Sequence, residues 1–151
     1  MRRKTAQLTD QQTRDVLTRG LWGTLATADA EGHPYATPMN YVYANGVIYL
    51  HAATEGHKLD NIRENPDVCF SVVTTAVVHP NRFDTEYTSA AAFGTAGVVT
   101  DPAEKRAALA ALMQKYSPDY AAEAAQYLEK NITRTTVISI ILTGISGKQN
   151  Q

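Results

Sequence analysis

Hydrophobic and polar residues alternate over much of this chain, a pattern typical of half-buried β-strands. In residues 47–52, Ile48 and Leu50 share one strand face, and His51 lies on the other. The turn Ala44-Asn45-Gly46 before this stretch is a strong hairpin signal. The pattern predicts roughly six strands, joined mostly by hairpins. They are expected at 21–28, 34–43, 47–52, 67–75, 87–100 and 135–143.

Helix signals occur between these strands. Thr9 and Gln12 form a capping box for a short helix that is expected to end at Gly20. A second short helix is expected to start near His57. Asp101-Pro102-Ala103-Glu104 then starts the first member of a helical pair that covers about 102–131. The residues expected on the buried faces of this pair are Leu109, Leu112, Met113, Tyr116, Tyr120, Ala124, Tyr127 and Leu128.

This order of elements predicts a mainly β fold with peripheral helices, of the α+β class. Hairpin-connected strands followed by a helical pair and one last strand suit a closed antiparallel barrel with helices on its outside. A doubly wound sheet is excluded because strands and helices do not alternate. Pro34 and Pro38 cannot donate to a ladder, so their strand is expected to have a free edge or a gap in pairing. Residues 1–151 are expected to form a single domain.

Composition narrows the classes of function. The chain has 151 residues, 44% hydrophobic and 19% charged, which is ordinary for a folded protein. A net charge of −1 gives no electrostatic case for nucleic acid. There is no apolar run of the ~20 residues that a membrane span needs, and no apolar segment follows the basic Met1-Arg2-Arg3-Lys4. A cytoplasmic protein without a membrane partner is therefore expected. Cys69, the single cysteine, is interpreted as a small core residue.

The stretch 47–66 holds the most suggestive chemistry. It predicts a strand, a bend containing Gly56, and a helix that starts with His57 and Lys58. Such a helix start is a plausible anion cradle, because its first N–H groups are unpaired and its dipole is positive there. The alternative is an ordinary connection with two solvated basic side chains. The four histidines are well separated and include no helical i, i+4 pair, so no metal site is expected.

Several sequence blocks then occur in a recognisable order over nearly the whole chain. They are Met1-Arg2-Arg3-Lys4, Gly23-Thr24-Leu25-Ala26-Thr27, Gly32-His33-Pro34-Tyr35 with Pro38 and Tyr41, Ile48-Tyr49-Leu50-His51-Ala52-Ala53, Gly56-His57-Lys58, Glu86-Tyr87-Thr88-Ser89, Phe93-Gly94 and Gly147-Lys148. This set resembles the nitroimidazole-resistance (Nim) branch of the FMN-binding split-barrel proteins, which are related to pyridoxamine phosphate oxidases.

The resemblance implies a six-stranded split barrel that forms a homodimer, with one FMN in each of two clefts between the subunits. It implies that the phosphate lies near Lys58, that Ser89 closes the cleft, and that His51 is the family's histidine near the flavin. The cofactor-binding residues that it implies are Thr37, Pro38, Met39, Leu50, His51, Ala52, Ala53, His57, Lys58 and Ser89.

Three functions remain open at this point. The first is a flavoenzyme in which FMN takes electrons from NAD(P)H or another donor and passes them to a small acceptor. The resemblance suggests a nitroaromatic acceptor, with His51 as the catalytic general acid and Tyr41 as a weaker candidate. The second is a non-catalytic flavin- or haem-binding protein in which His51 is an axial ligand. The third is a cofactor-free dimeric interaction domain. For His51 itself, the alternative to any of these roles is a half-exposed strand histidine without a role.

Overall fold

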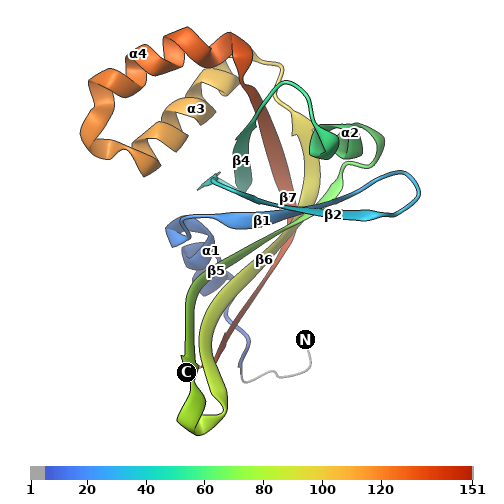
Figure 1. Ribbon diagram of the computed structural model, residues 1–151, viewed down its shortest axis with the longest axis vertical. Helices are drawn as coiled ribbons and strands as arrows, with labels where there is room; N and C mark the ends of the chain where they lie inside the picture. Colours follow the sequence, from blue (N-terminus) through green and yellow to red (C-terminus); the bar gives the residue numbers. More distant parts are fainter. Residues whose placement is uncertain (1–5, 151) are drawn as a thin grey trace.

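The computed structural model describes residues 6–150, and its main feature is one antiparallel sheet of seven strands in the order β2-β1-β5-β6-β7-β4-β3 (Figure 1). The strands are β1 (Gly23–Ala28), β2 (Pro34–Met39), β3 (Val42–Ala44), β4 (Val47–Ala52), β5 (Asp67–His79), β6 (Asp84–Val98) and β7 (Thr136–Asn150). The helices are α1 (Asp10–Arg19), α2 (His57–Glu64), α3 (Pro102–Tyr116) and α4 (Ala121–Asn131). Short 3₁₀ turns lie at Pro80–Arg82, Pro118–Tyr120 and Ile132–Arg134. The expected β-rich fold with peripheral helices is confirmed.

The expected strand 34–43 is in fact two strands, which is why the sheet has seven strands rather than six. The chain leaves β2 at Asn40-Tyr41, here called the crossing segment, and enters β3. β2 and β3 are the two edges of the sheet, so the crossing segment joins one edge to the other. The expectation of a free edge at Pro34 and Pro38 is confirmed, because both prolines lie on the edge strand β2. The result is a split barrel.

The barrel interior is filled by the side chains that the alternation assigns to it. Ile48 and Leu50 of β4 are completely buried. The same cluster takes in Leu25, Val68, Phe70, Val72, Ala90, Ala92, Ile138 and Ile140. The interpretation of Cys69 as a core residue is wrong: it lies between the buried Val68 and Phe70 and is only half-buried. Its partial burial still raises the pKa of the thiol.

The helical pair packs on the outside of the barrel, over β3, β4 and β7 (Figure 1). It encloses a second, smaller core of Val99, Ala108, Leu109, Leu112, Leu128 and Val137. The buried stripe expected on α3 is confirmed, but the one expected on α4 is wrong in part. Leu128 is the buried residue of α4, whereas Tyr120 and Tyr127 are 63% and 62% exposed. α4 therefore touches α3 along a narrow line. None of the helices within residues 6–150 is long and apolar enough to cross a membrane.

α1 is capped as its sequence predicts, with the Thr9 hydroxyl and the Gln12 side chain each bonded to the other's backbone N–H. It ends at Gly20, as expected, but not through a left-handed glycine, because φ at Gly20 is −60°. A Cβ there would lie 2.3 Å from Val72 Cγ1 and 2.5 Å from the Tyr41 hydroxyl. Close packing against the barrel therefore requires glycine at this position.

The C-terminal end of α3 is tied to the crossing segment by two neighbouring side chains. Lys115 Nζ donates to the carbonyl oxygens of Gly20 at 2.7 Å and Tyr41 at 2.9 Å, and it lies 3.9 Å from the centre of the Tyr41 ring. The Tyr116 hydroxyl lies 2.5 Å from the Leu21 carbonyl oxygen and accepts a hydrogen bond from Tyr41 N–H at 2.9 Å. We call Lys115 and Tyr116 the α3 clamp. It joins α1, both sheet edges and α3.

The clamp predicts a pH dependence of stability. Burial lowers the pKa of Lys115 from 10.5 to about 8. Between those values the unfolded chain binds more protons than the folded one, so the free energy of unfolding rises with pH. We expect the stability of the parent, relative to Lys115→Met, to increase from about pH 8 to pH 10. The slope stays below about 1.4 kcal/mol per pH unit, because water partly screens the amine.

Urea unfolding of both proteins at several pH values measures this difference. Lys130→Met, at an exposed position on α4, is the matched control for loss of a lysine from the helical pair. Parallel stability curves for the parent and Lys115→Met would contradict the assignment. We limit the comparison to pH 10, because burial raises the pKa of Tyr41 and its hydroxyl would act in the opposite direction above that.

Candidate functional site

The start of α2 has the geometry of an anion cradle. Gly56 is the N-cap, and its φ of 145° strains any residue with a side chain. Its carbonyl oxygen accepts from the N–H groups of Leu59 at 2.8 Å and Asp60 at 3.2 Å. The N–H groups of the preceding residues, His57 and Lys58, have no partner within the helix, as at any helix start. No atom lies within 4 Å of the place where a Cβ of Gly56 would sit, so the backbone is open to approach.

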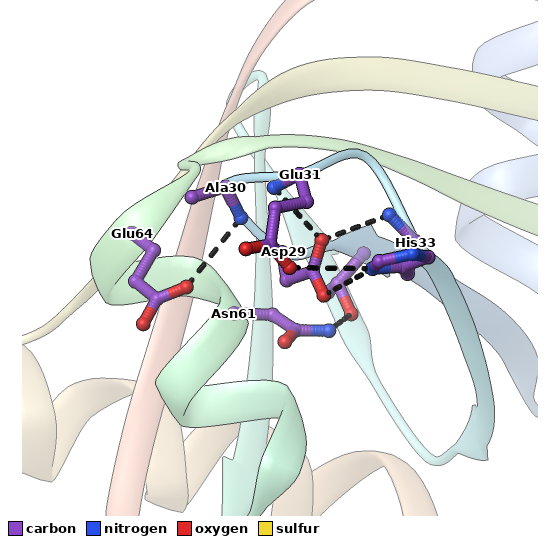
Figure 2. Close-up of polar contacts among 7 residues, drawn as sticks. Asp29, Ala30, Glu31, His33, Asn61 and Glu64 are labelled. Carbon is purple, nitrogen blue, oxygen red and sulfur yellow. Dashed lines mark hydrogen bonds and ion pairs between the residues drawn. The ribbon is translucent and has the colours of Figure 1, made fainter.

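Helix α2 is locked to the β1–β2 hairpin by polar contacts (Figure 2). The side-chain amide of the buried Asn61 donates to the Thr27 hydroxyl at 3.0 Å, and Glu64 accepts from Ala30 N–H at 3.4 Å. In the hairpin turn, the Asp29 carboxylate accepts from the N–H groups of Glu31 at 3.0 Å and His33 at 2.8 Å. The hydrogen bonds from the His33 N–H and ring are the main reason that the pKa of Asp29 is lowered, and the Glu31 N–H adds to them. The contacts of Asn61 and Glu64 with the hairpin therefore fix the position of α2 relative to β1 and β2.

Asp29, Glu31 and His33 are also the residues within 6–150 whose side chains are grouped closely enough to hold a metal ion. The His33 Nδ1 lies 2.9 Å from Asp29 and 3.6 Å from Glu31. Glu31 and His33 are largely exposed, and the turn accounts for the Asp29 contacts. His79 is likewise paired with a carboxylate, since its Nε2 lies 3.4 Å from Glu86.

A stacked pair of rings joins the cradle to the sheet edge. The rings of His57 at the start of α2 and Tyr35 on β2 are stacked, with centroids 4.4 Å apart and planes 18° from parallel. The pair places the first turn of α2 against β2. Tyr35 belongs to one of the sequence blocks that carry the family resemblance, but it was not predicted as a site residue. Its position between Pro34 and Pro38 on an expected edge strand was the feature of the sequence that could have identified it.

The predicted site residues of β2 point to both sides of the strand. Thr37 pairs with Leu25 and Met39 with Gly23, so these two side chains lie on the barrel's inner face. Pro38 points the other way and is exposed. Met39 packs against the main core. Among residues 6–150, Thr37 Oγ1 is the one buried side-chain oxygen or nitrogen without a hydrogen-bond partner.

The predicted site residues of β4 and the bend after it also lie in different surroundings, some in the barrel core and some on the outer face. The Leu50 side chain is completely buried in the barrel, so any ligand contact by this residue falls to its main chain. Ala52 packs against the same core, and Ala53 is exposed in the bend. His51 is exposed on the outer face, where it lines a pocket of about 280 Å³ under the helical pair. Lys58, half-buried at the cradle, is not part of that pocket.

Ser89 lies apart from the other predicted residues within one chain. Met39 pairs with Gly23, Gly23 with Val72, and Val72 with Ala90, so Ser89 is three strands away from β2. Its hydroxyl lies 3.5 Å from the Lys148 carbonyl oxygen. The structure of one chain thus does not group Ser89 with the predicted residues of β2.

Tyr41 does not suit the role of general acid that the sequence allowed it. Its side chain is completely buried, and its hydroxyl donates to the Leu17 carbonyl oxygen at 2.5 Å. Desolvation raises its pKa further above the ordinary value. Lys115 and Tyr116, which hold it, were not predicted. The sequence carried no signal for them beyond the apolar stripe on which Tyr116 lies.

Comparisons with known proteins now identify this arrangement. The structure is similar to that of a candidate 5-nitroimidazole antibiotic resistance protein from Bacteroides thetaiotaomicron. The two share 25% identity with a TM-score of 0.77, over 95% of this chain and 86% of that one. The flavocytochrome Anf3 from Azotobacter vinelandii is 20% identical with a TM-score of 0.82, over 100% of this chain and 72% of that one.

A third similar structure is an FAD- and haem-binding protein from Mycobacterium smegmatis, which is 24% identical with a TM-score of 0.82, over 97% of this chain and 74% of that one. No curated protein sequence matches this chain. The family described as pyridoxamine 5'-phosphate oxidase matches residues 9–149, nearly the whole length. The resemblance found in the sequence is confirmed, and the chain belongs to the pyridoxamine 5'-phosphate oxidase family.

Proposed function

We propose that this protein binds FMN and is an FMN-dependent oxidoreductase that passes electrons from NAD(P)H or another donor to a small acceptor. The observation that carries the proposal is the cradle at the start of α2, where Lys58 and two free N–H groups lie beside the edge strand β2. A phosphate dianion needs such cationic and N–H partners.

The residues along β2 fit a bound flavin. Thr37 lies two residues from Tyr35 on the same strand face, and Tyr35 stacks on His57 of the cradle. The buried Thr37 hydroxyl lacks a partner, although nearly all buried polar atoms in folded proteins have one. A ring system held along this edge would supply that partner. Lys58 and the helix N–H groups would then hold the phosphate, and the edge strand β2 would orient the ring.

When bound, FMN supplies the acceptance and transfer of electrons. The chain itself contributes binding, orientation and one mobile proton. His51, exposed on β4, is our candidate to donate that proton or a hydrogen bond to the acceptor. A nitroaromatic acceptor is the finer part of the proposal, and the similarity to the protein from Bacteroides thetaiotaomicron supports it. Haem is the weaker candidate, because the pocket that His51 lines has no Lys or Arg to pair with the two propionates.

Lys58→Ala tests the cradle. Loss of a charged hydrogen bond to the phosphate should weaken FMN binding by about 1.5–3 kcal/mol without unfolding the protein. Calorimetric titration with FMN measures the effect. Arg63→Ala is the matched control, since it removes a cation from the far end of α2 that is already paired with Asp60 at 2.9 Å. Riboflavin, which lacks the phosphate, should bind the parent and Lys58→Ala equally. Unchanged FMN affinity would place the phosphate elsewhere.

His51→Ala tests the step from binding to catalysis. We expect the variant to keep the flavin absorption spectrum and to lose ~10²–10⁴-fold in turnover of a nitroaromatic acceptor under NAD(P)H. His79→Ala, which removes a histidine paired with Glu86, is the control. A Soret band in the parent that disappears in His51→Ala would favour haem. A variant with unchanged spectrum and unchanged turnover would remove His51 from the mechanism.

We also propose that the protein is a homodimer with a flavin site shared between subunits. Within one chain Ser89 lies three strands away from β2, so a second copy is our candidate to bring Ser89 beside the cradle. Large apolar side chains are also exposed around the hairpin between β5 and β6 and near α1, including Phe83 (97% exposed), Val78, Val73, Trp22 and Leu21. Light scattering at low micromolar concentration should report twice the chain mass of 16.5 kDa. A stable monomer that still binds FMN would remove Ser89 from the site.

A further inference from the structure

The pocket between the barrel and the helical pair is separate from the phosphate cradle. It has a volume of about 280 Å³. His51 and Asn40 line it from the barrel side, and Leu112, Tyr116, Leu128 and Thr135 are among the residues that close it. None of Thr37, His57 and Lys58 takes part. The chain therefore offers two distinct places for two different chemical groups.

The twelve residues that line this pocket include no Asp, Glu, Lys or Arg, and its apolar part comes from Leu109, Leu112, Met113, Leu128 and Ile132. A carboxylate or phosphate would lose hydration here, and His51 is the single side chain that could become its cationic partner, so an anion is expected to bind less tightly than a neutral molecule. A neutral molecule loses far less. The amide of Asn40 and the imidazole of His51 can each give or accept one hydrogen bond.

Size and shape narrow the occupant further. The volume lies just below the range of roughly 300–1,000 Å³ that drug-sized ligands use. It suits a molecule with one ring rather than a flavin with its ribityl phosphate. Two tyrosines line the pocket, Tyr116 from α3 and Tyr127 from α4, and aromatic rings of this kind pack well against another ring. Tyr127 is left largely exposed although its position on α4 predicted burial, and it stands at this pocket.

We propose that the helical pair α3–α4 forms a binding site for a neutral, single-ring aromatic molecule, hydrogen-bonded by His51 or Asn40. The inserted helices then select the small molecule and exclude anionic ones. The further step, that this molecule is the electron acceptor, rests on the proposed function, because both arguments use His51. Binding of the molecule to the pocket does not depend on FMN.

The test compares two probes of the same ring size. 4-Nitrobenzyl alcohol is neutral, and 4-nitrobenzoate carries a carboxylate. Calorimetric titration of the full chain, with and without FMN, should give saturable binding of the alcohol. The benzoate should bind at least about tenfold more weakly than the alcohol. Ile132→Trp, which fills the pocket, should weaken binding of the alcohol by about tenfold or more. Tyr120→Ala, at an exposed position outside the pocket, is the matched control.

Tyr127→Ala gives a second variant in case Ile132→Trp does not fold, since an exposed side chain is removed with little effect on stability. It should weaken binding of the alcohol while FMN affinity stays unchanged. Equal affinities for the two probes, or binding that neither variant changes, would overturn the inference. Binding of the alcohol by a protein that ignores FMN would leave this site standing and refute the proposed flavoenzyme.

Discussion

The crossing segment depends on one buried residue, Tyr41. Its hydroxyl bonds to the end of α1, its ring meets the Phe70 ring edge-on at 4.8 Å, and its backbone is held by the α3 clamp. These contacts fix the point at which the chain passes from β2 to β3. The free edge of β2 and the floor of the pocket are both set there, because Thr37 precedes Tyr41 by four residues and Asn40 is its neighbour.

A second set of contacts positions the cradle independently of Tyr41. Asn61 and Glu64 attach α2 to the β1–β2 hairpin, and the stacked pair Tyr35–His57 attaches its first turn to β2. Lys58 is therefore held by the hairpin, whereas His51 belongs to β4 and faces the helical pair. The two residues that the sequence placed in one site are seven positions apart in the chain but lie on separate surfaces.

Local signals in the sequence were enough to predict most of the fold. The alternation in β4 identified its buried face, and the caps at Thr9 and Asp101 located two helix starts. The break at Asn40-Tyr41 was missed, because the apolar pattern continues through it and the contacts that hold the Tyr41 backbone come from residues 74 and 75 positions away in the chain. The exposure of Tyr127 was missed for a related reason. Helical periodicity gives the direction of a side chain but not whether another element covers it.

For the candidate site, the sequence located the cradle but not its neighbours. Gly56, His57 and Lys58 form a contiguous motif, which a linear reading can find. The stacking of Tyr35 on His57 and the separation of Ser89 from β2 depend on which strands pair, and no single segment encodes that.

Tyr116 belongs to two features of the structure at once, the pocket and the α3 clamp. Its ring lines the pocket, and its hydroxyl is one half of the α3 clamp on the crossing segment. A molecule bound in the pocket would touch the same residue that holds the crossing segment. If such a molecule bound the clamped form more tightly, it would stabilise the clamp, and by reciprocity the intact clamp would raise affinity in the pocket.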